Sequence, residues 1–497
     1  MRRFVLAIDQ GTTGTTALAM DADGAVIDRV TTNFPQYFPK PGWVEHDPDE
    51  IWGSVRTSVE KLLAKAGLDA AQLVCIGITN QRETSVIWDS ETLRSPVNAI
   101  VWQCRRTADE CERLKQEGYE DLVRAKTGLV LDPYFSATKL GLLAAGPEAR
   151  ALRASNHLKL GTIDSWLIAH LSGGKAHVTD VSNASRTSLY NIHLGEWDEE
   201  LCTLFQVPME LLPGVKPSSG VMATTLGLEW LPDGIPISGV AGDQQAALFG
   251  QGCFEPGQAK CTFGTGSFIL MNTGTEAVQS STGMLTTIAW QLDAKAPAYY
   301  ALEGGAFLCG AAVDWVRDSL GIIQSAQDIE TLANTVESSE GVDFVPALTG
   351  LGAPHWAPTA RGLITGLSRG THAGHIARAT LDAMALQNAD ILAAMVADCD
   401  LSLRDLRVDG GACANNLLMQ IQSDLLGRSL LRPLQIETTA IGACYLAGIG
   451  VGLWRDASHV GSLWKEERRF EPIWSDQQRA QRNAQWRAAT AQTLSRL

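Results

Sequence analysis

The same strand–turn–strand pattern occurs once in each half of the chain. In the first half an apolar run at residues 5–9 enters the turn GTTGTT (11–16), and another apolar run follows. In the second half residues 259–263 enter GTG (264–266), followed by SFILMN (267–272). Apolar strands joined by a short Gly-rich turn predict a β-hairpin. The repeat therefore predicts two domains, with one hairpin in each.

The length of the chain supports the same division. A chain of 497 residues is longer than one hydrophobic core usually supports, which predicts two large domains. The Gly- and Pro-containing segment 250–257 is typical of a hinge. We therefore expect an N-terminal domain over 1–252 and a C-terminal domain over 253–497.

Helical and extended segments alternate between the hairpins. Apolar residues at helical spacing predict helices over 48–65 and 373–395. Apolar runs predict strands over 73–79 and 406–408, and the second of these enters DGGACANN and a helix that ends at Leu426. Strands that alternate with helices predict an α/β fold.

Charge and cysteine content exclude several classes of function. The net charge of −15 disfavours nucleic acid as a partner, since proteins that bind it carry a basic face. The ten cysteines form no C-x-x-C pair and mostly lie in apolar surroundings, which predicts reduced thiols in a cytoplasmic protein. The N-terminal segment lacks the long apolar run of a signal peptide, and no stretch of 18 apolar residues predicts a membrane span.

Three Gly-rich turns predict a nucleotide site. Asp9 ends a strand beside GTTGTT, where backbone N–H groups and hydroxyls can meet phosphates and a carboxylate can hold Mg²⁺. The turn at 264–267 and the glycines of DGG (409–411) have the same character. The alternatives are an ordinary hairpin with an Asx-type cap and a plain strand-to-helix turn capped by an Asp.

Charged and aromatic side chains at other strand ends predict a site for a hydroxylated ligand. Arg82 and Glu83 follow an apolar strand in GITNQRETS, Trp102 follows another, and Tyr134 lies in a polar loop. Open α/β folds bind ligands at the carboxyl ends of their strands. Paired charges can hydrogen-bond polyol hydroxyls, and aromatic rings pack on polyol carbons. The alternatives are a surface ion pair and core packing of the aromatic rings.

Asp243 is the candidate catalytic residue. It follows an apolar strand and a Gly in VAGDQQAAL and begins an amphipathic segment. Its carboxylate can serve as the N-cap of a helix, or as the base that accepts the proton of a hydroxyl attacking the γ-phosphate of ATP.

Taken together, these segments resemble the FGGY carbohydrate kinases. The resemblance runs in order through almost the whole chain, in ITNQRET, NAIVWQCRRT, VTDVSNASRTSLYNIH, IPISGVAGDQQAALFGQ, FGTGSF, GLITGLSRGTHAGHIARATLD and VDGGACANNLLMQIQSD. It implies two actin-like (ribonuclease-H-like) ATPase domains with ATP and Mg²⁺ in the cleft between them. Similarity to the members that phosphorylate glycerol implies that glycerol is the substrate.

The resemblance also implies roles for individual residues. Asp243 is expected to be the general base and Asp9 to help hold Mg²⁺. The residues expected to hold the glycerol hydroxyls are Arg82, Glu83, Tyr134, Asp243 and Gln244, with Trp102 and Phe268 beside the carbon chain. The residues expected on the nucleotide side are Thr12, Thr13, Gly14, Thr16, Thr265, Gly310, Asp314, Gly411 and Asn415. Because family members are often oligomers, we also expect a homodimer or homotetramer.

Some positions depart from the family pattern. Thr16 stands where many relatives have an Arg, and Asp314 where they have an amide, so both phosphate and nucleoside contacts differ there. Lys139 is followed by LGL where the family signature expects an aromatic residue. GLEWLPDG lacks the basic residues of the fructose 1,6-bisphosphate loop, and no His lies between His193 and His355, so we expect neither that regulation nor His phosphorylation.

Two other functions remain open from the sequence. Another FGGY kinase, acting on erythritol, xylulose or gluconate, would share the same motifs. A nucleotide-driven switch of the actin or chaperone type would share the phosphate hairpins but lack the polyol residues, and would hydrolyse ATP without a polyol.

Overall fold

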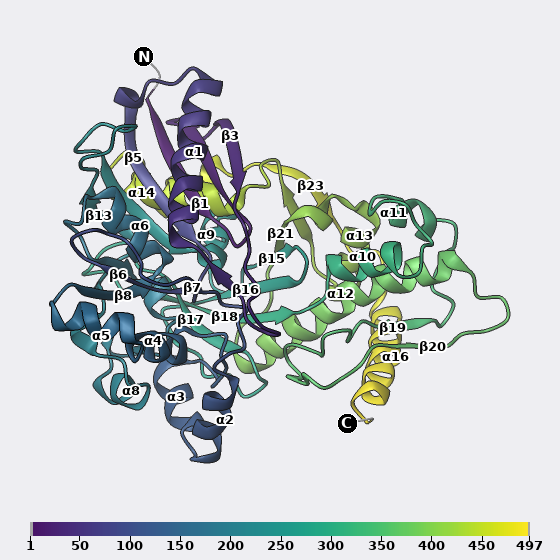
Figure 1. Ribbon diagram of the computed structural model, residues 1–497. Coiled ribbons are helices and arrows are strands. Elements are labelled where there is room, and N and C mark those ends of the chain that lie inside the picture. Colours follow the sequence, from purple (N-terminus) through teal and green to yellow (C-terminus); the bar gives the residue numbers. More distant parts are fainter. Residues whose placement is uncertain (1–2, 496–497) are drawn as a thin grey trace.

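The computed structural model describes residues 3–495 and contains two main sheets with helices packed around them (Figure 1). The α/β prediction is confirmed. The segment used to argue against a signal peptide begins with Met1 and Arg2. These two residues lie outside the described residues. Within the described part of the chain, no helix is both long and apolar enough to span a membrane.

The first sheet contains the first predicted hairpin. Its strand order is β13-β14-β5-β1-β2-β3. The antiparallel meander β1-β2-β3 places β1 beside β5, and β5 beside β14, both in parallel. The bounds are β1 Phe4–Gln10, β2 Gly14–Asp21, β3 Val26–Asn33, β5 Leu73–Asn80, β13 Ser219–Thr224 and β14 Pro236–Gly242.

The second sheet repeats this arrangement in the second half of the chain. Its strand order is β17-β18-β16-β15-β21-β22-β23. The meander β15-β16-β18 again places its first strand parallel to β21, and β21 parallel to β22. The hairpin repeat seen in the sequence is therefore a repeat of sheet topology. The bounds are β15 Ala259–Phe263, β16 Ser267–Gly274, β17 Leu285–Trp290, β18 Tyr299–Ala306, β21 Leu406–Asp409, β22 Leu430–Pro433 and β23 Glu466–Phe470.

The helices follow local sequence signals. Helix α1 (Pro48–Ala66) starts at the N-cap Asp47, whose carboxylate accepts from the Asp49 N–H, and ends at Gly67 with φ 62°. The helices predicted over 48–65 and 373–395 are present with ends within three residues of prediction. The other helices are α2 Ala108–Gln116, α3 Glu120–Thr127, α4 Ser136–Ala144, α5 Pro147–Ala154, α6 Ile163–Leu171, α7 Val181–Ala184, α8 Glu199–Leu204, α9 Asp243–Gly250, α10 Gly310–Asp318, α11 Asp328–Ala333, α12 Ala373–Asp398, α13 Asn416–Leu426, α14 Thr438–Gly450, α15 Ala457–Leu463 and α16 Asp476–Leu494.

Short strands pair outside the two main sheets. β4, β7, β6 and β8 form a small sheet beside the first one, and the others pair in twos. Their bounds are β4 Glu45–His46, β6 Ser85–Asp89, β7 Ala99–Ile100, β8 Leu158–Thr162, β9 Val178–Asp180, β10 Tyr190–Asn191, β11 Glu196–Trp197, β12 Gly214–Lys216, β19 Asp343–Val345 and β20 Leu363–Thr365.

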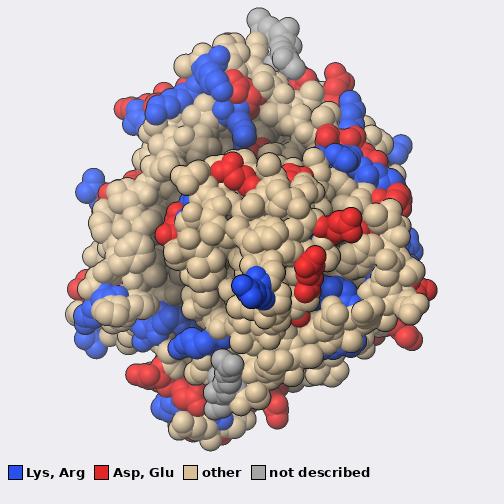
Figure 2. All heavy atoms as spheres, turned by 90° about the vertical axis from the view of Figure 1, so that its right-hand side faces the viewer, with Lys and Arg blue, Asp and Glu red and all other residues tan. Residues whose placement is uncertain are grey.

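Surface charge is mixed on the face of the molecule shown in Figure 2. Basic and acidic side chains are interspersed there among uncharged residues, and basic residues form no continuous patch on this face.

Helix α14 crosses back from the second half to pack against the first sheet and α9 (Figure 1). Glycines make this close approach possible. A Cβ built on Gly442 would lie 1.8 Å from the Ala246 carbonyl oxygen, and one on Gly77 would lie 2.2 Å from the Ala443 carbonyl oxygen. Gly239 on β14 meets the Ala447 backbone in the same way. We refer to the contact made by Gly77, Gly239 and Gly442 as the glycine seam. It fixes the position at which the two halves meet.

The seam makes Gly442 sensitive to a single methyl group. Gly442→Ala is expected to lower stability by about 1–3 kcal/mol or more, because the added Cβ meets backbone that cannot move away. Gly53→Ala in α1 is the matched control. It adds the same methyl in a helix where nothing lies within 4 Å, and should gain about 0.5–1 kcal/mol. Thermal melts of both variants test this prediction. An equal change in melting temperature in the two variants would contradict the close packing at Gly442.

Candidate active site

Strand register brings three of the predicted residues to one edge of the first sheet. Asp9 of β1 and Ala241 of β14 both pair with Thr79 of the intervening strand β5. Because these three strands are parallel, the residues that follow them emerge at the same edge. Arg82 follows β5 by two residues, and Asp243 follows β14 directly. Sequence positions 9, 82 and 243 therefore converge.

The two carboxylates at this edge interact with each other. Burial and, to a smaller extent, the negative charge of Asp243 together raise the pKa of the Asp9 carboxyl to about 7. Clustered carboxylates that repel each other fit a divalent cation, and Mg²⁺ commonly uses one or two protein carboxylates, with water and phosphate completing its shell. This donor set therefore fits the predicted magnesium role of Asp9.

Arg82 and Glu83 belong to a buried charge network, so the alternative of a surface ion pair is wrong. Their side chains are 2% and 1% exposed. Arg82 Nη1 donates to Glu303 Oε2 at 2.6 Å, and its Nη2 donates to Glu303 Oε1 at 2.8 Å. Arg186 Nε donates to Glu83 Oε1 at 2.7 Å, and its Nη2 to Glu303 Oε1 at 3.0 Å. We refer to Arg82, Glu83, Arg186 and Glu303 as the charge quartet.

The quartet contains one carboxylate of firmly negative charge. Burial alone would raise the pKa of the Glu303 carboxyl, but Arg186 and Arg82 outweigh burial and lower that pKa to about 2. Glu83 differs, since burial raises the pKa of its carboxyl despite the same two guanidinium groups. Two cations and two acidic groups thus lie together away from water.

The backbone at Glu83 is held in an uncommon conformation. Its φ is 60°, in the left-handed region that costs a non-Gly residue about 1–3 kcal/mol. The Glu83 carbonyl accepts from Ser136 Oγ at 3.1 Å and from Ser85 Oγ at 3.2 Å. Such strain concentrates at functional sites, and here the serines stabilise the turn that directs the Glu83 carboxylate into the quartet.

Tyr134 and Trp102 lie against the same network. Arg82 Nη2 donates to the Tyr134 hydroxyl at 3.2 Å, and the Tyr134 and Trp102 rings meet edge to face with centroids 5.5 Å apart. Trp102 Nε1 donates to Thr12 Oγ1 at 3.0 Å, which joins the predicted polyol residues to the predicted phosphate turn. The buried Lys139 Nζ donates to the Tyr134 carbonyl at 2.6 Å and so fixes this loop.

Phe268 comes from the second half and lies on the same sheet face as Glu303. It pairs with Gly305 on β18, and a Cβ on Gly305 would lie 3.2 Å from its ring. Side chains alternate along a strand, so residues 303 and 305 share a face. The second sheet thus contributes both a ring and a carboxylate to the region around Arg82.

Asp243 is held but accessible. Its carboxylate lies 3.3 Å from Arg82 Nε and is 32% exposed, whereas Arg82 is buried. Gly242, not Asp243, is the N-cap residue of α9, but Asp243 Oδ1 accepts from the Gln244 N–H at 2.7 Å and so still satisfies a backbone donor at the helix start. The neighbouring Gln244 accepts a hydrogen bond from Lys260 of β15, whose Nζ also donates to Thr262 Oγ1 at 2.9 Å.

Two of the predicted nucleotide-side residues, Thr265 and Gly310, lie together in the second half. In the second half the turn at Thr265 packs on the start of α10, where the Gly310 N–H donates to the Gly264 carbonyl at 2.9 Å and the Ala311 N–H to the Thr265 carbonyl at 3.1 Å. A Cβ on Gly310 would lie 2.7 Å from that Gly264 oxygen, so the position requires glycine.

The departures from the family pattern have partners of their own. Thr16 Oγ1 hydrogen-bonds Thr31 Oγ1 at 2.8 Å, and Asp314 pairs with Arg317 at 3.0 Å on the surface of α10.

Asn415 caps α13 through Oδ1, which accepts from the Leu418 N–H at 2.8 Å. The preceding Asp409 caps no helix in the described structure, since its Oδ2 accepts from Gln251 Nε2 at 2.9 Å and Thr438 Oγ1 at 2.6 Å.

Sequence reasoning missed three charged residues of the site. Arg186, Glu303 and Lys260 are all buried and all contact predicted site residues. Arg186 carried a signal, since it lies in the segment VTDVSNASRTSLYNIH that resembles the family. Glu303 and Lys260 lie within strands of ordinary composition, and no local pattern singles them out.

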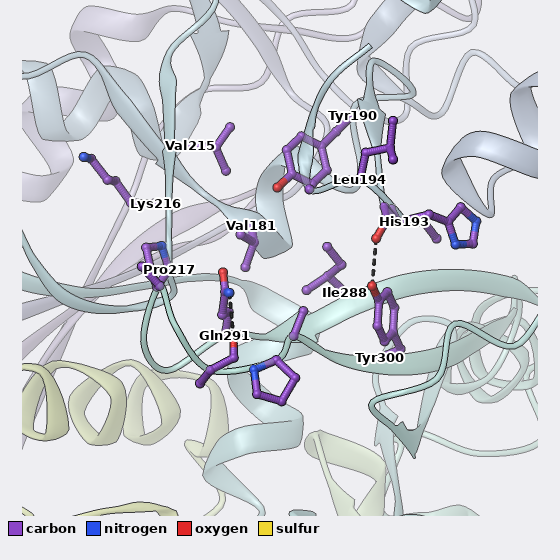
Figure 3. Close-up of a pocket in the computed structure, with 16 residues that line it drawn as sticks. Val181, Tyr190, His193, Leu194, Val215, Lys216, Pro217, Ile288, Gln291 and Tyr300 are labelled. Carbon is purple, nitrogen blue, oxygen red and sulfur yellow. Dashed lines mark hydrogen bonds between the residues drawn. The ribbon is translucent and has the colours of Figure 1, made fainter.

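A separate cavity of about 420 Å³ lies between the segment that follows α6 and the β17–β18 hairpin (Figure 3). Val181, Val215 and Ile288 contribute apolar side chains to it, and the Tyr300 hydroxyl donates to the Ile192 carbonyl at 2.7 Å along its wall. Its lining includes none of the predicted site residues.

Comparison with known proteins agrees with this geometry. The family described as "FGGY family of carbohydrate kinases" matches with its N-terminal domain over residues 4–250 and its C-terminal domain over residues 259–451. The chain belongs to the FGGY family of carbohydrate kinases. The family predicted from the sequence motifs is thus confirmed. The exact boundary at 252/253 stays a prediction.

Relatives match along their entire length. The chain is 54% identical to the glycerol kinase of Bdellovibrio bacteriovorus and 52% identical to that of Geobacillus sp., with 100% of each chain covered. The crystal structure of Plasmodium falciparum glycerol kinase with ADP has a TM-score of 0.93 at 34% identity, covering 99% of this chain and 98% of that one. A xylulose kinase from Lactobacillus acidophilus, 21% identical with a TM-score of 0.87 and covering 98% and 97%, shares the fold. The predicted fold of two actin-like domains is confirmed.

The raised pKa of Asp9 predicts a pH-dependent stability. Without Mg²⁺, folded Asp9 keeps its proton up to about pH 7, whereas an unfolded chain releases it near the ordinary value of 3.8. The folded state therefore binds more protons between these values, and stability falls as pH rises from 3.8 to about 7. Asp9→Asn removes this loss, and should be more stable than the wild type at pH 8 by about 4 kcal/mol.

Thermal melts in EDTA at pH 4.5 and pH 8 test this prediction. The difference in melting temperature between Asp9→Asn and the wild type should be small at pH 4.5 and large at pH 8. The other titrating groups are common to both proteins and do not contribute to this difference. If the variant and the wild type differ in melting temperature by the same amount at both pH values, the pKa of Asp9 is not raised at this site.

Proposed function

We propose that the protein transfers the γ-phosphate of ATP to glycerol, giving sn-glycerol 3-phosphate and ADP. The observation that carries the proposal is the position of Asp243. Its accessible carboxylate stands at a strand end, 3.3 Å from the buried Arg82 and beside Asp9. Full-length relatives at more than 50% identity bear the name glycerol kinase, which supports glycerol as the substrate.

The polyol residues divide the work of binding and orientation. Arg82 donates to the glycerol hydroxyls and Glu83 accepts from them, while Tyr134 and Gln244 complete the hydrogen bonds. Trp102 and Phe268 flank the carbon chain. A pocket that pairs each hydroxyl discriminates strongly against analogues that lack one, because its own buried polar groups would then be left unpaired.

Asp243 acts as the general base of a direct transfer. The terminal hydroxyl oxygen of glycerol bonds to the γ-phosphorus while the bond from that phosphorus to the β,γ-bridging oxygen breaks. The hydroxyl proton passes to the Asp243 carboxylate, and ADP leaves with the bridging oxygen. The contact with Arg82 holds the carboxylate in place and directs it toward the hydroxyl, so the base is positioned before the phosphate arrives.

The Gly/Thr turns of both halves receive the nucleotide. Thr12, Thr13 and Gly14 offer hydroxyl and backbone N–H donors to the phosphates, with Thr16 behind them on β2. The groups on the other side are Thr265, Gly310, Asp314, Gly411 and Asn415. Asp9 would hold Mg²⁺, which when bound neutralises phosphate charge. A homodimer or homotetramer and a cytoplasmic location stay predictions.

Other FGGY kinases provide the second candidate function. Xylulose and gluconate kinases share this fold at about 21% identity, so fold alone leaves the substrate open. The favouring observation for glycerol is the edge-to-face pair of Tyr134 and Trp102, in which the Tyr134 hydroxyl accepts from Arg82, because this pair crowds the polyol side with aromatic rings.

Substrate identity can be tested by ADP release. Purified protein with Mg-ATP should release ADP rapidly with glycerol and only slowly with erythritol, dihydroxyacetone, xylulose or gluconate, because the site is matched to three hydroxyls. A blank without polyol sets the hydrolysis rate. If another member of the panel stimulates ADP release instead, that compound and not glycerol is the substrate. If ADP release is equal in the blank, the protein has no polyol site.

The role of Asp243 can be tested by substitution. Asp243→Asn should lower kcat by about 10²–10⁴-fold while glycerol still binds, since the amide keeps the shape but accepts no proton. Asp28→Asn is the control, because this carboxylate on β3 has a similar exposure and pairs with Lys65 of α1, so its loss should leave kcat unchanged. Steady-state kinetics and calorimetric glycerol titration supply both readouts. Full turnover in Asp243→Asn would exclude it as the base.

A further inference from the structure

The charge quartet contains two residues that the proposed roles do not use. Arg82 and Glu83 contact the polyol in that scheme, but Arg186 and Glu303 do not. Arg186 follows α7 in the first half, and Glu303 lies on β18 in the second half, 221 positions from Arg82 in the sequence. Their side chains are 0% and 3% exposed.

Glu303 determines the orientation of the Arg82 guanidinium. It accepts from both terminal nitrogens of Arg82, at 2.6 and 2.8 Å, and this two-point contact defines the plane of the group. With that plane fixed, Nε lies 3.3 Å from Asp243 Oδ1, and Nη2 reaches the Tyr134 hydroxyl. Arg82 therefore meets the base and a polyol residue only in the orientation that Glu303 imposes.

Arg186 orients the Glu83 carboxylate in a similar way. Its Nε holds Glu83 Oε1 at 2.7 Å while its Nη2 holds Glu303 Oε1 at 3.0 Å. The guanidinium lies over the Phe135 ring, 5.2 Å from the centroid. Among the described residues its Nη1 has no hydrogen-bond partner although it is buried. One guanidinium thus connects the Glu83 carboxylate to the carboxylate that fixes Arg82.

Stability alone explains such a network poorly. Buried ion pairs contribute little net stability, because desolvation offsets their attraction, and apolar residues of equal volume often serve as well. Here Arg82 directs its nitrogens toward Asp243 and Tyr134. Glu303 and Glu83 contact Arg82, and Arg186 holds both of these carboxylates. This is the arrangement expected of supporting residues around a binding site.

We propose that Glu303 and Arg186 are positioning residues for polyol recognition, and that the second half of the chain thereby completes the glycerol site built on the first half. This inference rests on the proposed function. Glu303 fixes Arg82, Arg186 fixes Glu83, and both contacts are needed for the two ligand-binding groups to be oriented toward glycerol together.

The test compares glycerol binding with nucleotide kinetics in the full-length protein. Glu303→Gln keeps the shape but removes the charge, and should raise the calorimetric Kd and the KM for glycerol by about tenfold or more. The KM for Mg-ATP should stay within about twofold, since the quartet touches none of the phosphate turns. Glu303→Asp retains the charge on a shorter stem and should recover part of the glycerol affinity.

Asp343→Asn is the matched control. Asp343 pairs with Arg482 at 2.7 Å, with both side chains nearly buried, on β19 and α16 in the second half. Its substitution breaks an ion pair of the same kind and should lower the melting temperature without changing the glycerol Kd. If Glu303→Gln lowers the melting temperature equally and leaves the glycerol Kd unchanged, the quartet is structural and the inference is overturned.

Arg186→Lys provides an independent measurement if Glu303→Gln does not fold. Lysine keeps the charge but cannot bridge two carboxylates in one plane, so the glycerol KM should again rise while the KM for Mg-ATP does not. An unchanged glycerol KM would overturn the inference. The proposed function fails separately, and visibly, if the wild-type protein neither binds glycerol nor releases ADP in response to it.

Discussion

The glycine seam sets the geometry on which the site depends. Helix α14 comes from the second half of the chain but lies against β5, β14 and α9 of the first, at distances that only glycine permits at residues 77, 239 and 442. Because α14 lies in the sequence between β22 and β23, this contact anchors a connection of the second sheet onto the first. The packing of backbone against backbone thus helps to hold together the two halves that contribute Arg82 and Glu303.

Repetition of one topology explains why the site faces a junction. Each half uses a hairpin meander beside parallel strands, and parallel strands gather their carboxyl ends at one edge. In the first half this register forces Asp9 toward Asp243, and the repulsion contributes to raising the pKa of Asp9 to about 7. A fold selected for stability alone would avoid that contact, whereas a site for a cation and phosphates exploits it.

Local structure was predictable because its causes are local. Both hairpins, helix α1 with its Asp47 and Gly67 caps, and the strand before DGG follow from short patterns. The cluster of Asp9, Arg82 and Asp243 was predicted as well, through strand ends. Glu303 and Gly442 were not, because their importance lies in contacts hundreds of positions away. Phe268 was found only through resemblance to a family, since an aromatic residue in a strand ordinarily indicates a core.

The charge quartet gives polyol recognition a consequence for the rest of the reaction. Its longest-range link, between Arg82 and Glu303, joins the half that carries the base to the half that carries the GTG turn. An orientation of Arg82 that suits glycerol therefore exists only when the two halves are apposed. The same apposition joins the half that carries the GTG turn, where the nucleotide is proposed to bind, to the half that carries Asp243. The proposed polyol site and the proposed nucleotide site therefore depend on one arrangement of the two halves.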